Sequence, residues 1–296
     1  MPRTDLFRWA ELAPMPLPRA GCAAGVLGGK LVVAGGTLWR ADRKIWCDRV
    51  DSFDPGANRW ESCAPLPRPL GDSACVAVGD ALYALGGGAE GSTESAVWRF
   101  QSGSWTLLSD SALPAPRRSP AAAVLDGTVY VLGGYESADL ASAASTLWAW
   151  RPGGRWEARA ARPGPVRFSP AVAPVGGRII AAGGATVENG VVRNLDDILA
   201  YDPAADSWSA IGRLPEPNRA ACGLADEGRF LFIGGYTDKF ERPILAIDPG
   251  TGTAAPAGSL PHGLADTRFL RMGARIIGAT GECGNKVRAP WTLAAG

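Results

Sequence analysis

Histidine is nearly absent from this chain, whose 296 residues include only His262. Sites that need two or three imidazole ligands are therefore excluded, and we predict no metal centre. Long apolar runs are also missing, since none approaches the roughly 18 residues that a membrane-spanning helix requires. Cysteine is sparse as well: six thiols in a chain of this length do not make a disulfide scaffold, and they predict reduced, buried side chains.

An excess of one charge is equally absent, with 30 Lys and Arg residues against 29 Asp and Glu residues and a net charge of +1. Without a global positive field, we expect neither nucleic acid nor a membrane surface as a partner. The first residues, MPRTDLFRWAEL, lack the apolar region of a signal peptide. The expected location is cytoplasmic, or periplasmic or secreted if a leader has been removed.

Signature motifs of several large enzyme classes are missing too. The sequence contains no P-loop, no dinucleotide-binding fingerprint, no zinc pattern and no Gly-x-Ser-x-Gly nucleophile elbow. The sequence therefore gives no indication of a nucleotide-dependent enzyme, and we predict that no cofactor is needed.

What the chain does contain is a repeat with a period near 50 residues. Its marker is a Gly-Gly pair that follows an apolar run, as in KLVVAGG and TVYVLGG. The pairs begin, at steps of 51, 47, 50 and 51 residues, at Gly35, Gly86, Gly133, Gly183 and Gly234. A further step of 46 residues reaches Thr280-Gly281, where the first glycine is lost. A turn rich in Gly and Asp precedes the runs, which predicts a β-hairpin in each unit.

Tryptophan follows the same period and identifies the last strand of each unit. It recurs at Trp9, Trp60, Trp105, Trp156 and Trp208. Ala254 stands at the next expected position. Each unit therefore contains four short strands: one rich in small residues, one ending in Gly-Gly, one ending near Asp-Pro, and one carrying the tryptophan. Six such units predict an all-β fold, a six-bladed β-propeller with four antiparallel strands per blade.

The predicted boundaries make residues 1–296 a single propeller domain. The blade cores are expected at residues 17–62, 63–107, 113–158, 163–210, 214–256 and 260–296. The chain starts with a tryptophan-type strand at residues 6–13 and ends with a strand of the third type. The N-terminal strand should therefore join the C-terminal blade, which closes the ring and removes an open sheet edge.

The spacing of Gly-Gly, Asp-Pro and Trp resembles the kelch repeat over essentially the whole chain. Kelch propellers carry unrelated functions, so this resemblance implies the fold and no single activity. The last blade, where GECGNKVRAP contains Glu282 and Arg288, is similar to that of the bacterial N-acetylneuraminate epimerase (sialic acid mutarotase) group. This similarity implies a cofactor-independent isomerase of carbohydrate metabolism that acts on an acidic sugar. Those epimerases are generally exported, and the missing signal sequence departs from the group.

Kelch proteins are similar in placing a ligand at one mouth of the central channel, on a rim of loops. In this chain the rim positions lie 15 and 14 residues before each glycine pair and directly after it. A residue that breaks the repeat there is a functional candidate, whereas a repeated residue serves the scaffold. The catalytic candidates are Glu282, Asp266, Tyr135 and His262. The substrate-binding candidates are Asp72, Arg118, Arg167, Phe168, Arg219, Tyr236 and Arg288.

These residue types suit a small polar ligand, because arginine forks bind carboxylates and aromatic faces pack on a ring. Opening a cyclic hemiacetal needs a base at the anomeric hydroxyl and an acid at the ring oxygen. Glu282 with an Asp or Tyr partner would supply both, since partial desolvation near the axis raises a carboxyl pKa. The alternatives are ordinary solvated loop residues, a Glu282 that only pairs with Arg288 or Arg271, and a scaffold role for Arg167.

Two other functions remain open from the sequence. The rim could bind a peptide or protein without chemistry, with loops 37–47 and 186–197 as the contact surface. The same acid–base parts could also serve a metabolite cyclase or isomerase in a biosynthetic pathway. A narrow pocket with Glu282 beside a second titratable group would favour the enzyme, and a broad, shallow basin would favour binding.

Overall fold

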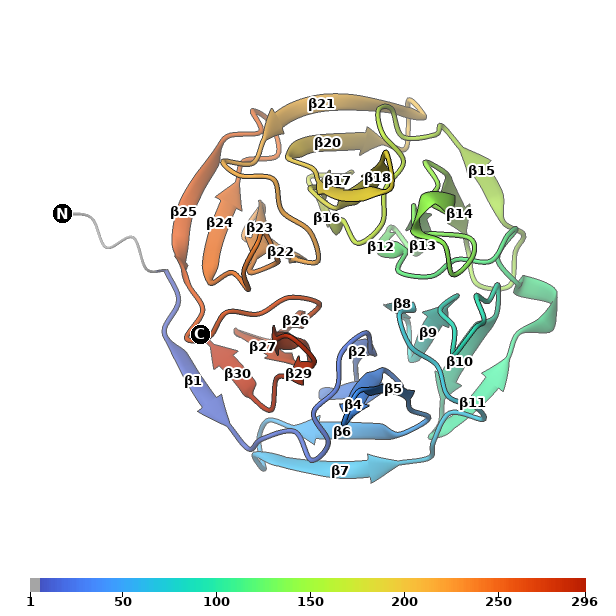
Figure 1. The fold of residues 1–296 in the computed structure, drawn as a ribbon, viewed down its shortest axis with the longest axis vertical. Coiled ribbons are helices and arrows are strands. Elements are labelled where there is room, and N and C mark those ends of the chain that lie inside the picture. Colours follow the sequence, from blue (N-terminus) through green and yellow to red (C-terminus); the bar gives the residue numbers. More distant parts are fainter. Residues whose placement is uncertain (1–5) are drawn as a thin grey trace.

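The computed structural model describes residues 6–296 and consists almost entirely of β-strands (Figure 1). Six four-stranded sheets surround a central opening, which confirms the predicted all-β, six-bladed propeller. The helical parts of the described chain are two 3-10 turns, η1 (Ser109–Ser111) and η2 (Leu140–Ser142). Neither of them has the length and apolar character needed to cross a membrane.

The first five blades follow one another in chain order. Blade one contains β2 (Ala23–Leu27), β3 (Lys30–Ala34), β6 (Val50–Asp54) and β7 (Arg59–Cys63). Blade two contains β8 (Ala74–Val78), β9 (Ala81–Leu85), β10 (Val97–Gln101) and β11 (Ser104–Leu107). Blade three contains β12 (Ala121–Leu125), β13 (Thr128–Leu132), β14 (Leu147–Trp150) and β15 (Glu157–Arg159). Blade four contains β16 (Ala171–Val175), β17 (Arg178–Ala182), β20 (Asp197–Asp202) and β21 (Ser207–Arg213). Blade five contains β22 (Cys222–Asp226), β23 (Arg229–Ile233), β24 (Pro243–Ile247) and β25 (Ala254–Ser259).

Blade six is assembled from both ends of the chain. It contains β26 (Arg268–Met272), β27 (Arg275–Ala279), β30 (Thr292–Ala295) and β1 (Trp9–Leu12). The outer strand β1 pairs antiparallel with β30, in a register that runs from Trp9↔Ala295 to Leu12↔Thr292. The N-terminal strand therefore closes the ring, as the sequence predicts, and Trp9 is the outer-strand tryptophan of this blade.

The strand sequences explain the radial order of each blade. The innermost strands are rich in small residues, such as AAGVL in β2 and AAAVL in β12, because six of them converge near the axis (Figure 1). The tryptophans lie at the outer strands, and in blades one to four their rings pack on an aromatic residue of the third strand. Trp60 lies 5.2 Å from Phe53 and Trp208 lies 5.2 Å from Tyr201, measured between ring centroids.

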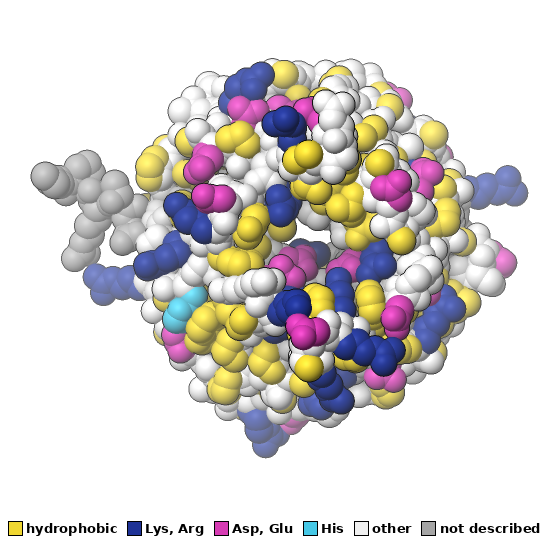
Figure 2. Space-filling model, in the orientation of Figure 1, with side chains coloured by type: hydrophobic (Ala, Val, Ile, Leu, Met, Phe, Trp, Pro, Cys, Tyr) yellow, Lys and Arg dark blue, Asp and Glu magenta, His cyan; other side chains and the backbone are white. Residues whose placement is uncertain are grey.

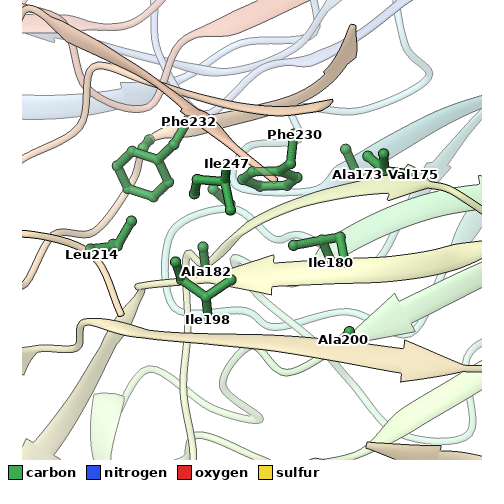
Figure 3. Close-up of a cluster of buried hydrophobic side chains, with 12 residues drawn as sticks. Ala173, Val175, Ile180, Ala182, Ile198, Ala200, Leu214, Phe230, Phe232 and Ile247 are labelled. Atoms are coloured by element: carbon green, nitrogen blue, oxygen red, sulfur yellow. The ribbon is translucent and has the colours of Figure 1, made fainter. Parts of the chain in front are cut away.

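The hydrophobic core lies between neighbouring blades, and Figure 3 shows the cluster that joins blades four and five. Phe230 and Phe232 of β23 and Ile247 of β24 pack with Ile180 of β17 and Ile198 of β20. All five side chains are buried. Full burial of one such side chain stabilises a fold by about 1.5–3 kcal/mol. Similar clusters recur around the ring, so each blade is held by its two neighbours.

The glycine pairs link each blade to the next. At all six junctions the amide of the second residue donates a hydrogen bond of 2.7–3.2 Å to a carbonyl of the following blade. The donor and acceptor residues are Gly36–Leu70, Gly87–Arg117, Gly134–Arg167, Gly184–Asn218, Gly235–Leu264 and Gly281–Arg19. The first residue of the pair lies against the same carbonyl, and a Cβ added to Gly35 would be 2.1 Å from the Leu70 oxygen. This close approach explains why glycine recurs there.

Three two-stranded hairpins extend from one face of the ring, between the second and third strands of blades one, four and six (Figure 1). They are β4 (Thr37–Arg40) with β5 (Arg43–Trp46), β18 (Ala185–Glu188) with β19 (Val191–Asn194), and β28 (Glu282–Gly284) with β29 (Val287–Arg288). The first and third contact each other, because Lys286 Nζ donates to Asp42 Oδ1 at 2.6 Å and lies 5.1 Å from the Trp39 ring centroid. The segments 37–47 and 186–197 thus contain ordered hairpins.

Candidate functional site

Six backbone bridges form the rim of the central opening. Each joins the position 15 residues before a glycine pair to the position directly after that pair. The bridged residues are Ala20–Thr37, Gly71–Gly88, Arg118–Tyr135, Phe168–Ala185, Arg219–Tyr236 and Ala265–Glu282. Figure 2 shows acidic and basic side chains gathered around the hollow at the centre of this face. The bridges therefore bring together, from four different blades, the candidates Arg118, Tyr135, Phe168, Arg219, Tyr236 and Glu282.

A second ring is formed by the residue that directly follows the first bridged residue of each blade. Its members have left-handed φ angles between +49° and +64°, and they are Gly21, Asp72, Ser119, Ser169, Ala220 and Asp266. At five junctions the amide of one member donates to the carbonyl of the member before it, at 2.7–3.2 Å. The side chains of Asp72, Ser119, Ser169 and Asp266 line a cavity of about 140 Å³ in the channel.

Asp266 is a carboxyl group whose surroundings disfavour its charge. Burial raises its pKa from the usual 3.8 to about 6, and the charges of Asp72 and Glu282 act in the same direction. Arg268 and Arg288 oppose this rise, and Arg268 Nη1 lies 3.8 Å from Asp266 Oδ1. The side chain is 31% exposed, so a ligand in the cavity can reach it. A carboxyl group that titrates near neutral pH can both donate and accept a proton.

Arg118 and Asp72 form an ion pair beside the cavity. Arg118 donates to Asp72 Oδ2 from Nε at 2.9 Å and from Nη2 at 2.8 Å. Lys44 Nζ lies 3.7 Å from the same oxygen. Trp46 packs against both cations, with its ring 5.3 Å from each of them. The charge of Arg118 is thus already compensated inside the protein.

Aromatic side chains complete this part of the rim. Tyr135 and Phe168 meet edge to face, with their ring centroids 5.8 Å apart. Burial raises the pKa of Tyr135, and the nearby charge of Asp72 adds to the rise. The phenol therefore stays protonated at neutral pH and can donate a hydrogen bond to a ligand. Tyr236 lies two blades further along the rim, in blade five, and packs edge to face on Phe240 at 5.1 Å.

Glu282 and Arg288 face each other across the hairpin β28–β29. Arg288 Nη1 donates to Glu282 Oε1 at 2.6 Å, and Arg288 Nε donates to the Thr37 carbonyl of blade one at 3.0 Å. The arginine is buried, whereas the Glu282 side chain is 37% exposed. Glu282 is therefore a paired carboxylate that still borders the mouth. Arg271, the other partner considered from the sequence, pairs with Asp226 instead.

Arg219 is held at the rim by neutral groups. Its Nη1 donates to Asn194 Oδ1 at 2.6 Å, and its guanidinium carbon lies 4.6 Å from the Tyr236 ring centroid. Burial lowers the pKa of Arg219, and the negative charge of Glu282 opposes this effect. Asn194 comes from the hairpin β18–β19, so this insertion orients a residue of the candidate site.

Two sequence candidates lie away from the mouth. Arg167 is fully buried inside a blade, where Nη2 donates to the Asp197 carboxylate at 2.6 and 2.7 Å and Nη1 donates to the Gly183 carbonyl at 2.7 Å. It therefore has the scaffold role that was the alternative for it. His262 lies at the closing seam, where Nε2 is 2.7 Å from Glu11 Oε1 and the ring stacks on Trp291 at 3.6 Å. Neither side chain lines the cavity.

Sequence reasoning missed Arg268, which lines the cavity at the start of β26. The equivalent residue in the other five blades is small: Ala23, Ala74, Ala121, Ala171 and Cys222. Arg268 therefore breaks the repeat, two residues after the rim position Asp266. Comparing the six blades at this position as well would have identified it as a candidate. Lys44 and Asn194 could not be found in this way, because they lie on inserted hairpins that have no counterpart in every blade.

The arrangement combines one carboxyl group with a raised pKa, a protonated phenol, two ion-paired carboxylates and several guanidinium groups around a small cavity. Such a set can hold hydroxyl and carboxylate groups and can move protons between ligand oxygens. Within residues 6–296, no three His, Cys, Asp or Glu side chains gather in a way that could hold a metal ion.

Comparison with known proteins agrees with the repeat pattern. A model of the Kelch motif matches residues 18–67. Kelch-like protein terF of Aspergillus terreus is 30% identical over 241 residues, which cover 77% of this chain and 52% of that protein. Human Kelch-like protein 34 is 30% identical over 252 residues, which cover 80% of this chain and 38% of that protein. The chain thus spans about half, or less, of the length of these relatives.

Among solved structures, that of YjhT superposes on this chain with a TM-score of 0.75. The match has 15% sequence identity and covers 84% of this chain and 87% of that chain. At this identity the likeness is one of fold.

Proposed function

This chain is a kelch-repeat protein with a six-bladed propeller fold, and we propose that it is a cofactor-independent isomerase of the mutarotase type. The reaction takes place where the channel mouth meets the cavity, and the substrate is an acidic sugar or a related metabolite. The similarity of the last blade to the sialic acid mutarotase group supports the reaction class. The observation that carries the proposal is the position of Asp266, whose carboxyl group lines the cavity 3.8 Å from Arg268. Burial there raises its pKa to about 6.

The chemistry needs one proton acceptor and one proton donor. A carboxylate takes the proton of the anomeric hydroxyl while the acid form of Asp266 gives its proton to the ring oxygen. The bond between the anomeric carbon and the ring oxygen then breaks, and the open carbonyl form results. Reversal of both transfers on the other face of the carbonyl closes the other anomer. Glu282 fits the acceptor role, since Arg288 fixes its carboxylate at the mouth, and Tyr135 is a further donor.

The size of the cavity limits how the ligand lies. Ligand pockets commonly measure about 300–1,000 Å³, whereas the cavity beside Asp266 measures about 140 Å³. Only the reacting end of a sugar would enter it, and the rest of the molecule would lie on the rim against Tyr135 and Tyr236. Phe168 is only 6% exposed, so it supports the Tyr135 ring and does not contact the ligand. An isomerase or cyclase of another metabolite would use the same parts, and thermal-shift screening of metabolites would distinguish these substrates.

The pH dependence of the reaction tests the proposal. We expect the protein to speed anomer exchange of N-acetylneuraminate or another sugar acid above the rate in buffer, measured by NMR. Since the acid form of Asp266 disappears above its pKa, the rate should fall as pH rises through about 6. Well above that pH the fall should be about tenfold per pH unit. Exchange no faster than in buffer for every sugar acid tried would refute the proposal.

Peptide or protein binding is a second candidate, supported by apolar side chains exposed on the hairpins. Val191 and Val192 of β19 are 56% and 37% exposed, and Val287 of β29 is 51% exposed. A bound peptide or protein that covered these valines would remove their apolar surface from water. If this function is correct, peptides selected from a display library should lose affinity in Val191→Asp and bind Asp266→Asn as they bind the wild type. Loss of affinity in Asp266→Asn alone would argue against it.

A further inference from the structure

Four arginines border the channel mouth, and three of them have a carboxylate partner. The ion pairs are Arg118–Asp72 at 2.8 Å, Arg268–Asp266 at 3.8 Å and Arg288–Glu282 at 2.6 Å. Arg219, the fourth, forms no ion pair with any residue in the range 6–296. A guanidinium group that is partly desolvated and has no counter-ion raises the free energy of the unliganded protein. The mouth is therefore incomplete at this one position.

The orientation of Arg219 is fixed in advance of any ligand. Asn194 accepts from Nη1 at 2.6 Å, and the same amide donates to the carbonyl groups of Tyr236 at 2.9 Å and Thr237 at 3.2 Å. These two bonds set which way the Asn194 oxygen points. The Tyr236 ring covers one face of the guanidinium group. Within the described chain, Nε and Nη2 have no hydrogen-bond acceptor, and the residue is partly exposed to the mouth.

We propose that Arg219 is the anion-binding residue of this site, and that the ligand carries a carboxylate or phosphate group. This inference rests on the proposed function, because it names the substrate class of the same mouth. Two free N–H donors on a planar fork match the two oxygens of a carboxylate or phosphate, and a fixed fork loses little entropy on binding. Arg118 and Arg288 could take this role only by giving up the ion pairs that they already make.

The position of Arg219 also determines how the ligand is oriented. The next residue, Ala220, accepts a hydrogen bond of 2.7 Å from the amide of Asp266. The anion site and the titrating carboxyl group are thus on neighbouring turns of adjacent blades. A ligand anchored on Arg219 extends over the cavity that Asp266 lines, so Arg219 contributes to orientation as well as affinity.

Binding measurements by calorimetry with D-glucuronate, D-glucose 6-phosphate and D-glucose test the inference. We expect the wild type to bind at least one anionic sugar at least tenfold more tightly than glucose. Comparison of the two anionic sugars shows whether the site prefers a carboxylate or a phosphate group, because the preferred one binds more tightly. Arg219→Gln should remove this preference, and Arg219→Lys should lose most of it, because a point charge replaces the fork. The matched control is Arg213→Gln, since that arginine is 74% exposed on β21 and carries the same charge.

Three results would overturn the inference. They are a wild type that binds neither anion more tightly than glucose, an Arg219→Gln variant that keeps the preference, and an Arg213→Gln variant that loses it equally. The readout does not depend on turnover. A protein that binds anionic sugars through Arg219 but does not exchange their anomers would contradict the proposed isomerase and leave the anion site in place.

Discussion

Replacing Asp266 with asparagine should abolish turnover and yet make the fold more stable above pH 6. Asparagine has nearly the same shape but can neither give nor take the proton, so the acid–base step is lost. Removing a general acid or base typically costs about 10²–10⁴-fold in rate. Asparagine also tolerates the left-handed backbone at this position, where φ is +51°. A loss of folding is therefore not expected.

The gain in stability follows from the direction of the pKa shift. The pKa of Asp266 is raised from 3.8 to about 6, so the folded state binds this proton more tightly than the unfolded state. The tighter binding of this proton stabilises the folded state fully below pH 3.8, and the stabilisation is lost as pH rises through about 6. A shift of two pKa units corresponds to about 3 kcal/mol. Because the Asp266 side chain is 31% exposed, solvent screening reduces this contribution to roughly 1–2 kcal/mol. Asparagine does not ionise and avoids this loss at neutral pH.

Asp126 provides a matched control for this substitution. It has a similar left-handed φ of +49°, and it lies exposed in the turn between β12 and β13. Asp126→Asn should change neither turnover nor the pH dependence of unfolding. The measurements are anomer exchange by NMR and urea unfolding between pH 5 and pH 8. If Asp266→Asn kept wild-type turnover, Asp266 would not be the acid–base group. If the variant were less stable than the wild type at pH 8, the folded protein would not disfavour the charge of Asp266.

The repeat made the fold predictable, because the glycine pairs and tryptophans occupy positions that the packing of neighbouring blades requires. The close contact between Gly35 and the Leu70 carbonyl excludes any side chain, so the pattern survives in five blades. The same regularity located the rim, since each glycine pair fixes which residues bridge across it.

The chemistry of the rim was less predictable, because it depends on contacts between blades. The pairing of Glu282 with Arg288, and of Arg288 with Thr37 of blade one, combines opposite ends of the chain. The raised pKa of Asp266 results from burial and from charges on several blades. A single sequence gives the residue types at these positions. It does not show that Glu282 is hydrogen-bonded to an arginine at 2.6 Å, whereas Asp266 lines the cavity with its arginine 3.8 Å away.

The second prediction with a large expected effect concerns the glycine pairs. Gly35→Ala should destabilise the protein by about 3 kcal/mol or more, because φ is +63° and the new Cβ would lie 2.1 Å from the Leu70 oxygen. The same oxygen accepts the Gly36 amide, so blade two cannot move away without breaking that bond. Gly28→Ala is the control: its φ is +56°, and nothing lies within 4 Å of the added Cβ. It should cost only about 1–2 kcal/mol, the cost of the left-handed backbone.

Blade six allows the reverse substitution. Thr280 has a φ of +72° and is 1% exposed, and its hydroxyl has no hydrogen-bond partner among the described residues. A β-branched residue in this backbone region is strained by about 1–3 kcal/mol, and the unsatisfied hydroxyl adds to the cost. Thr280→Gly should therefore raise the free energy of urea unfolding by about 1 kcal/mol, whereas Gly35→Ala lowers it. Equal losses in Gly35→Ala and Gly28→Ala, or a loss in Thr280→Gly, would show that backbone approach between blades does not determine where the glycines recur.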